Sequence, residues 1–176
     1  MDSDSYSYSQ KQLDDLFLRM ISFYEGDPKR IQHFTKVHSF SRIIGIEEEL
    51  DDTTLFILET AAYTHDIGIR PAEEKYGKCD GKLQEQEGPI YAQQLLSELG
   101  FENYMIERIC YLIGHHHTYT NVEGMDYQIL IEADFLVNLF EDDLNEREVQ
   151  NIYERIFKTK TGKQLFCEMY GYAEET

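Results

Sequence analysis

Basic residues are scarce in this 176-residue sequence, which has 16 lysines and arginines against 34 acids and a formal net charge of −18. A surface with this charge repels phosphate groups, so we expect neither a nucleic-acid polymer nor a membrane as a partner. Cysteines are also few: Cys79, Cys110 and Cys167 are odd in number and form no CxxC pair. This pattern argues against a disulfide framework or a cysteine zinc site and favours a reducing, cytoplasmic location.

Long hydrophobic runs are missing too. No apolar stretch approaches the roughly 18 residues of a membrane-spanning helix, and the first residues lack a signal-peptide pattern. Enough apolar material is present for a folded core, because 41% of the residues are hydrophobic and 13% are aromatic. That composition excludes intrinsic disorder of the whole chain, and its length corresponds to one domain.

Apolar residues recur at the three- and four-residue spacing of amphipathic helices, whereas the alternation typical of strands is nearly absent. We therefore predict an all-α fold, a single compact bundle of about seven or eight helices over residues 10–176, preceded by a disordered terminus at residues 1–9. Residues 71–88 contain four glycine or proline positions and mixed charge. We predict that they form a long loop with at most one helical turn.

Histidines and carboxylates gather at or near the predicted helix ends. His65 and Asp66 end one helix, the triplet His115–His117 follows another, and Asp134 stands among apolar residues within a third. Taken singly, they have ordinary explanations: a helix terminus, a solvated loop and a hydrogen-bonded core aspartate. Taken together, they supply the imidazole and carboxylate ligands that bind a divalent first-row metal. A buried carboxylate such as Asp134 also requires a cation or a hydrogen-bond network.

The segment Thr64-His65-Asp66-Ile67-Gly68 resembles the signature of the HD-domain phosphohydrolases. Members of that family carry an earlier histidine in a helix, with the spacing His-x-x-x-Val-x-x-x-small. His33, Val37 and Ser41 match this spacing, whereas His38 does not. On a helix, His33 also shares a face with the apolar stripe. We therefore assign His33 as the ligand and interpret His38 as structural.

Two later features extend the resemblance over approximately residues 28–140. His115 and His116 resemble the helix-end histidines of the two-metal branch of the family, and Asp134 resembles its closing aspartate. The resemblance implies an HD-type helical domain with one or two divalent transition-metal ions, which can be Mn, Fe, Co, Ni or Zn.

One departure from the family pattern concerns the second metal ion. Two-metal members usually have a further histidine at the position that Gln84 occupies here. Glutamine is a poor metal ligand, and the nearby Glu85 or Glu87 is the alternative, since carboxylates bind hard divalent ions well. The sequence leaves the choice between one ion and two open.

The resemblance implies metal-assisted hydrolysis of a phosphoester or phosphoanhydride in a small phosphorylated substrate, which we expect to be a nucleotide. The implied metal ligands are His33, His65, Asp66, His115, His116 and Asp134. Asp66 is expected to hold the attacking water, and His115 and His116 to bind a second ion or to act as acid and phosphate donors. Expected substrate contacts are Lys75, Glu87 and Tyr119, with Lys36, Arg70, Lys78 and Lys82 as further cations near in sequence.

Two other functions stay open. Some HD-fold proteins are di-iron oxygenases, which need a full two-metal ligand set, so Gln84 weighs against that reading. Others are non-catalytic domains that sense a ligand, and they are marked by loss of metal ligands that are retained here. A homodimer is also open, because the stripe Phe135, Leu136, Leu139 and Phe140 is either core or a dimer face.

Overall fold

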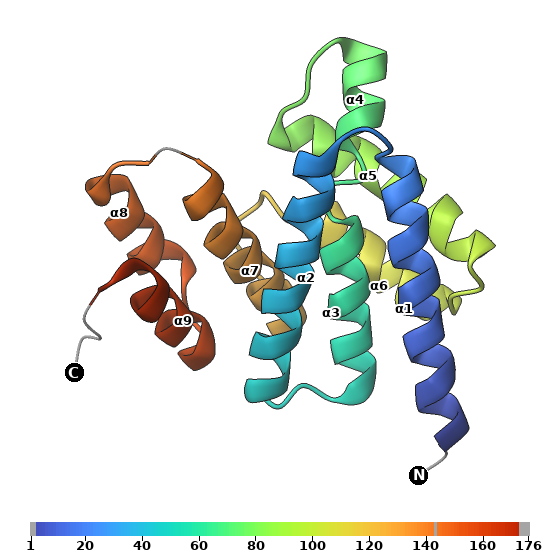
Figure 1. Cartoon of the computed structure of the whole chain (residues 1–176), viewed down its shortest axis with the longest axis horizontal. Helices are drawn as coiled ribbons and strands as arrows, with labels where there is room; N and C mark the ends of the chain where they lie inside the picture. The colour runs from blue at the N-terminus through green and yellow to red at the C-terminus, as the bar shows by residue number, and fades with distance from the viewer. Residues whose placement is uncertain (1–2, 143, 173–176) are drawn as a thin grey trace.

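Helices account for the fold throughout the part of the chain that the computed structural model describes, residues 3–142 and 144–172. Nine helices and no strand occur in these ranges (Figure 1). Their bounds are α1 Ser3–Phe23, α2 Pro28–Glu47, α3 Asp52–Thr64, α4 Ile69–Tyr76, α5 Gly81–Glu98, α6 Asn103–Ile113, α7 Met125–Glu141, α8 Glu146–Ile156 and α9 Lys160–Tyr170. The predicted all-α fold class is therefore confirmed.

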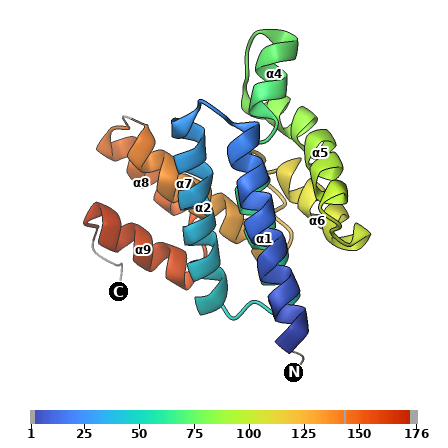
Figure 2. The ribbon, with the colours of Figure 1, turned by 45° about the vertical axis from the view of Figure 1, so that its right-hand side comes forward.

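Helix α3 is enclosed by four others, which places its end inside the molecule. It packs against α1, α2, α6 and α7, and Leu58, Ala61 and Ala62 have no exposed surface. The small alanines allow neighbouring helices to approach closely. Helix α2 lies beside α3, and α7 packs on α2 (Figure 1). Figure 2 shows α8 and α9 at the opposite side of the molecule from α5 and α6.

Local signals determine where α2 and α3 begin. Asp27 caps α2 by accepting a hydrogen bond from Arg30 N at 3.2 Å, and Pro28 occupies the first helical position, where its missing N–H costs nothing. Asp51 caps α3 through the backbone N–H groups of Thr53 and Thr54. The cap at Asp27 lies at the same end of α2 as His33, whereas the cap at Asp51 lies at the end of α3 away from His65.

Residues 71–88 are more helical than predicted, because they contain most of α4 and the first turns of α5. Gly88, one of the glycines that suggested a loop, and Gly68, which precedes this segment, are needed for close packing instead. A Cβ on Gly68 would lie 2.7 Å from Gln84 O, and one on Gly88 would lie 2.6 Å from Ile113 Cγ2. These two glycines let α5 pass close to the segment after α3. The prediction of a long loop was therefore wrong.

The N-terminal segment also continues further as a helix than expected. We predicted a disordered terminus at residues 1–9, but the backbone of α1 is helical from Ser3 onward. Extending an existing helix costs less than starting one, so a short polar segment readily joins α1. Residues 1 and 2 lie outside the described residues. None of the helices within these ranges has the length and apolar character that crossing a membrane requires.

Candidate metal centre

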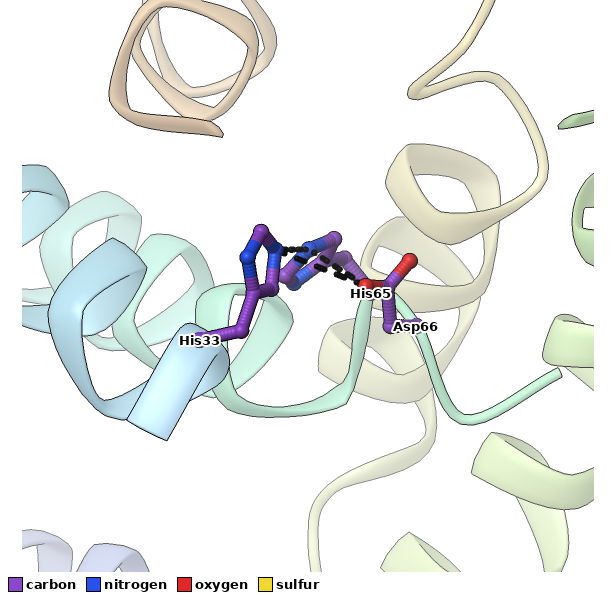
Figure 3. A group of neighbouring side chains, drawn as sticks. All are labelled: His33, His65 and Asp66. Atoms are coloured by element: carbon purple, nitrogen blue, oxygen red, sulfur yellow. Dashed lines mark hydrogen bonds and ion pairs between the residues drawn. The ribbon is translucent and has the colours of Figure 1, made fainter. Parts of the chain in front are cut away.

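Three helices bring four of the predicted ligands to one point. His33 lies on the inner face of α2, and His65 and Asp66 directly follow the last residue of α3 (Figure 3). Asp134 lies in the middle of α7, which packs on α2. Three of these residues are nearly inaccessible to solvent: His33 is 8% exposed, His65 0% and Asp134 4%. The enclosed end of α3 therefore presents the His-Asp pair to both neighbouring helices.

The spacing of the ligand atoms fits a single metal ion. His33 Nε2 lies 3.2 Å from His65 Nε2, 3.1 Å from Asp134 Oδ1 and 3.4 Å from Asp66 Oδ2. His65 Nε2 lies 3.4 Å from Asp66 Oδ2 and 3.6 Å from Asp134 Oδ1. Two nitrogen ligands each about 2.1 Å from one ion are separated by about 3.0 to 3.4 Å in octahedral or tetrahedral geometry. These side chains already stand at approximately that separation.

Hydrogen bonds at the far side of each imidazole ring set its tautomer. His65 Nδ1–H donates to Ala62 O at 2.9 Å, and His33 Nδ1–H donates to Glu141 Oε2 at 2.9 Å. With the proton on Nδ1, each Nε2 lone pair faces the site. Lys36 Nζ in turn donates to Glu141 Oε1 at 2.5 Å and holds this carboxylate in place. Glu141 is thus a carboxylate partner of a metal-ligating histidine, an arrangement common in metal sites.

The electrostatics of the site favour a bound cation. Burial alone would lower the pKa of His33, but the neighbouring carboxylates of Asp134 and Asp66 outweigh it and raise this pKa to about 9. Burial would raise the pKa of each aspartate, yet the neighbouring histidines hold both values below the usual range. Without a metal ion, a proton on His33 supplies the positive charge that these two carboxylates require.

Two buried atoms at the site have no hydrogen-bond partner, which supports the fit of a metal. Among the described residues, buried side-chain atoms without a partner are Ser41 Oγ, His116 Nε2 and Asp134 Oδ1. An unpartnered polar atom costs about 1–3 kcal/mol in the interior, so the last two indicate a missing ligand. Imidazole nitrogens with carboxylate oxygens are a donor set that suits divalent transition metals.

A second group of ligand atoms shares Asp66 with the first. It consists of Asp66, His116 and His117, whose ligand atoms lie within 4.8 Å of one another. His116 Nδ1–H donates to Ile113 O at 2.7 Å, which turns its Nε2 to within 3.6 Å of Asp66 Oδ1. His117 Nε2–H donates to Gln84 Oε1 at 3.0 Å. Burial and then the nearby His116 lower the pKa of His117 to about 4, so it is neutral at pH 7.

His115 lies outside both groups, although the sequence suggested His115 and His116 as the pair. Its Nδ1–H donates to Tyr111 O at 2.7 Å, and its ring stacks on Tyr111 at 4.3 Å. Helix α6 ends at Ile113, and the turn that follows directs His115 back along the helix and the next two histidines inward. The pair that the structure brings to Asp66 is therefore His116 and His117.

His38 has partners of its own away from the metal centre. Its Nε2 lies 3.0 Å from Glu59 Oε1, and its ring stacks on Tyr63 with centroids 3.9 Å apart. This arrangement agrees with the structural interpretation of His38. Glu85, one of the two alternatives to the missing histidine, accepts hydrogen bonds from His117 N and Thr118 Oγ1 instead.

Of the three expected substrate contacts, Tyr119 lies beside the second ligand group, with its Oη 3.5 Å from His117 Nδ1, whereas Lys75 and Glu87 pair with each other. Glu87, which is 2% exposed, accepts hydrogen bonds from Lys75 Nζ at 3.1 Å and Tyr76 Oη at 2.7 Å. Tyr119 packs against Phe135 with ring centroids 5.3 Å apart. The side chains of Lys75 and Glu87 therefore pair with each other across α4 and α5, and Glu87 is no substitute for the missing histidine ligand.

A cavity of about 430 Å³ opens over the ligand atoms. Its wall includes the ligands His33, Asp66 and Asp134, and further members are Lys29, Arg30, Gln84, His117, Asn138, Glu141 and Asp142. Sequence reasoning missed several of these, and helical spacing is the signal that would have found them. Lys29 precedes His33 by four residues, whereas Asn138 and Glu141 follow Asp134 by four and seven, so each shares a face with a ligand.

Comparison with known proteins places these observations in a family context. A family model described as HD domain matches residues 30–160, which is more than half of the chain and includes all four ligands of the first group. The fold is similar to the crystal structure of YpgQ from Bacillus subtilis, with a TM-score of 0.64 and 18% sequence identity. That alignment covers 94% of this chain and 89% of the other. No curated protein matches the sequence.

Proposed function

Because the chain belongs to the HD domain family, a superfamily of metal-dependent phosphohydrolases, we propose that it hydrolyses a phosphoester or phosphoanhydride in a small phosphorylated substrate. One observation carries the proposal: the ligand atoms of His33, His65, Asp66 and Asp134 converge beside a cavity. Manganese, iron, cobalt, nickel and zinc all suit this donor set. Retention of all four ligands weighs against a purely ligand-sensing domain.

The chemistry divides between the metal and the side chains around it. When bound, a divalent metal lowers the pKa of a coordinated water and adds positive charge that stabilises the phosphoryl oxygens. Asp66 directs Oδ2 toward His33 and His65 and Oδ1 toward His116, so it is placed to accept a hydrogen bond from the attacking water. Of the two histidines for which the sequence suggested the role of acid or phosphate donor, His115 and His116, it is His116 that lies beside Asp66 and takes this role.

The direct test combines elemental analysis of the purified protein with a phosphate-release screen. Nucleotides come first in the screen, because they are the substrate class that we propose, and sugar phosphates follow. We expect about one transition-metal ion per chain and hydrolysis that stops when a chelator removes the metal and resumes when the metal returns. Metal-loaded protein without phosphate release on any substrate contradicts the proposal. Two irons with oxygen-dependent chemistry favour the oxygenase alternative.

We further propose that the first group holds one metal ion firmly and that Gln84 keeps the second group from holding another. His117 Nε2–H donates a hydrogen bond to Gln84 Oε1. This nitrogen therefore carries a proton, and it has no lone pair with which to bind a metal ion. The amide oxygen that receives this bond is also a weak ligand compared with imidazole.

Replacing Gln84 by histidine is therefore expected to raise the metal content from about one to about two ions per chain. The substitution removes the acceptor that fixes His117 and adds an imidazole to the wall of the cavity that Asp66 also lines. Elemental analysis after dialysis gives the stoichiometry, and electron paramagnetic resonance of the manganese form reports coupling between two ions. Gln86→His is the matched control, because Gln86 bonds to Tyr76 Oη and Glu87 outside the ligand groups. Two firmly held ions in the unmodified protein would contradict this prediction.

A further inference from the structure

We propose that Lys29 binds the phosphoryl group of the substrate. This inference rests on the proposed function and adds to it a residue that determines specificity for phosphate. It starts from an imbalance of charge in the cavity, whose wall carries the carboxylates Asp27, Asp66, Asp134, Glu141 and Asp142. A phosphate entering such a cavity needs positive charge that no carboxylate has already neutralised.

Only two lysine or arginine side chains line the cavity among the described residues, and they differ in their partners. Arg30 is held by carboxylates on both sides, Asp27 Oδ2 at 2.9 Å and Glu73 Oε1 at 2.7 Å. Lys29 has no hydrogen bond or ion pair with any residue that the structure describes, and it is exposed. Its ammonium group is therefore free to bind an anion without first giving up another contact.

The cations near in sequence that we had considered lie elsewhere or are engaged. Lys36 Nζ bonds to Glu141, Lys75 Nζ bonds to Glu87, and the Arg70 guanidinium donates to the backbone carbonyls of Phe23 and Glu25. Lys78 lies 4.0 Å from Asp80, and Lys82 does not line the cavity. Elimination thus leaves Lys29 as the uncompensated cation beside the metal centre within the described ranges.

The position of Lys29 on α2 suits this role. It lies four residues before His33, so the two side chains share one face of the helix and are separated by about 6 Å along its axis. A lysine side chain is long enough to reach an anion bound over the ligand cluster. Across the cavity, Asn138 stands one turn after Asp134 on α7, and its side-chain amide has no partner among the described residues.

A phosphate bound in this cavity would meet positive charge from two sources. One is the metal ion that His33 and Asp134 would help to hold, and the other is the Lys29 ammonium in the cavity wall. Lysine is a compact point charge with three donors and suits a phosphate whose orientation is set by another group. Asn138 adds a neutral donor that does not change the charge of the cavity.

The test measures binding of inorganic phosphate to the manganese-loaded full-length chain, using the paramagnetic broadening of its phosphorus resonance. We expect Lys29→Ala to weaken phosphate binding by about tenfold or more, as loss of a charge-assisted hydrogen bond predicts. The manganese content should stay unchanged, because Lys29 is not a ligand. Lys82→Ala is the matched control: it removes the same charge from an exposed position on α5 outside the cavity and should leave phosphate binding unchanged.

Kinetics with the best substrate from the phosphate-release screen give a second reading. Lys29→Ala should raise KM by a similar factor, and Lys29→Arg should recover part of the loss. If the unmodified protein binds phosphate at the metal and Lys29→Ala binds it equally well, the inference on Lys29 is overturned while the proposed function stands. If the metal-loaded unmodified protein neither binds phosphate nor hydrolyses any substrate, both are overturned together.

Discussion

Replacing His33 by alanine is expected to weaken metal binding by more than about 100-fold and to abolish metal-dependent hydrolysis. His33 Nε2 has the ligand atoms of His65, Asp66 and Asp134 within 3.4 Å. The alanine variant therefore lacks the ligand atom at the centre of the first group. Mutation of a residue that only orients a metal ligand already lowers metal affinity by about 10–100-fold, and loss of the ligand itself should lower it further. Competition with a chelating dye measures the affinity.

His38→Ala is the control for this prediction. Both histidines lie on α2 and are largely buried, but His38 pairs with Glu59 and stacks on Tyr63. We expect this variant to retain its metal ion and its activity while losing some thermal stability. His33→Gln, which keeps most of the side-chain volume, guards against a loss caused by unfolding. Loss of the metal in His38→Ala but not in His33→Ala would overturn the ligand assignment.

The set His33, His65, Asp66 and Asp134 was implied by the resemblance to the HD-domain family, and helical periodicity agreed with the choice of His33. His33 repeats with the apolar positions of α2, and its burial follows from that face packing inward. Asp134 stands in a helix whose neighbouring side chains are nearly all buried. A buried acid must either pair with another group or bind a metal. This requirement follows from its burial alone, so the sequence around Asp134 is enough to predict it.

The histidines after α6 were harder to place, because a turn decides their directions. Successive residues in a turn point to different sides, so an error of one position exchanges His115 for His117. Only the hydrogen bonds from His115 to Tyr111 O and from His116 to Ile113 O settle which rings face Asp66. Such bonds depend on where the helix ends, and sequence patterns locate helix ends to within a few residues at best.

The segment over residues 71–88 shows how a glycine can mislead. Glycine signals a turn when its backbone needs a positive φ, as at Gly77 with φ of 68°, which ends α4. Gly68 and Gly88 are instead needed because two segments approach closely. The sequence does not distinguish the two reasons, since the second depends on a neighbour that is distant along the chain.

Replacing Glu132 by alanine is expected to lower the free energy of unfolding by about 3–5 kcal/mol. This carboxylate is 0% exposed and lies on α7, two residues before Asp134. It accepts hydrogen bonds from Lys158 N at 2.6 Å, from Thr159 N at 2.9 Å and from Thr159 Oγ1 at 2.5 Å. Removing it leaves these donors without a partner, at about 1–3 kcal/mol for each buried group.

The hydrogen bonds of Glu132 join the connection between α8 and α9 to the helix that carries Asp134. Thr159 extends this connection to α9, because its Oγ1 also caps that helix by accepting a hydrogen bond from Gly162 N at 2.9 Å. Unfolding in urea at pH 7 measures the change, and the melting temperature should fall by about 10 °C. Glu154→Ala, at an exposed position on α8, should change stability by less than about 0.5 kcal/mol.

Gly162→Ala gives an independent test of the same contact. A Cβ at Gly162 would lie 1.9 Å from Glu132 Oε2, so the methyl group must displace the carboxylate from its donors. We expect this variant alone to be strongly destabilised, and we expect the added cost of Gly162→Ala to be much smaller in the Glu132→Ala background. A double-mutant cycle measures this coupling. Additive effects would mean that the carboxylate does not occupy the space beside Gly162, and the role of Glu132 would have to be abandoned.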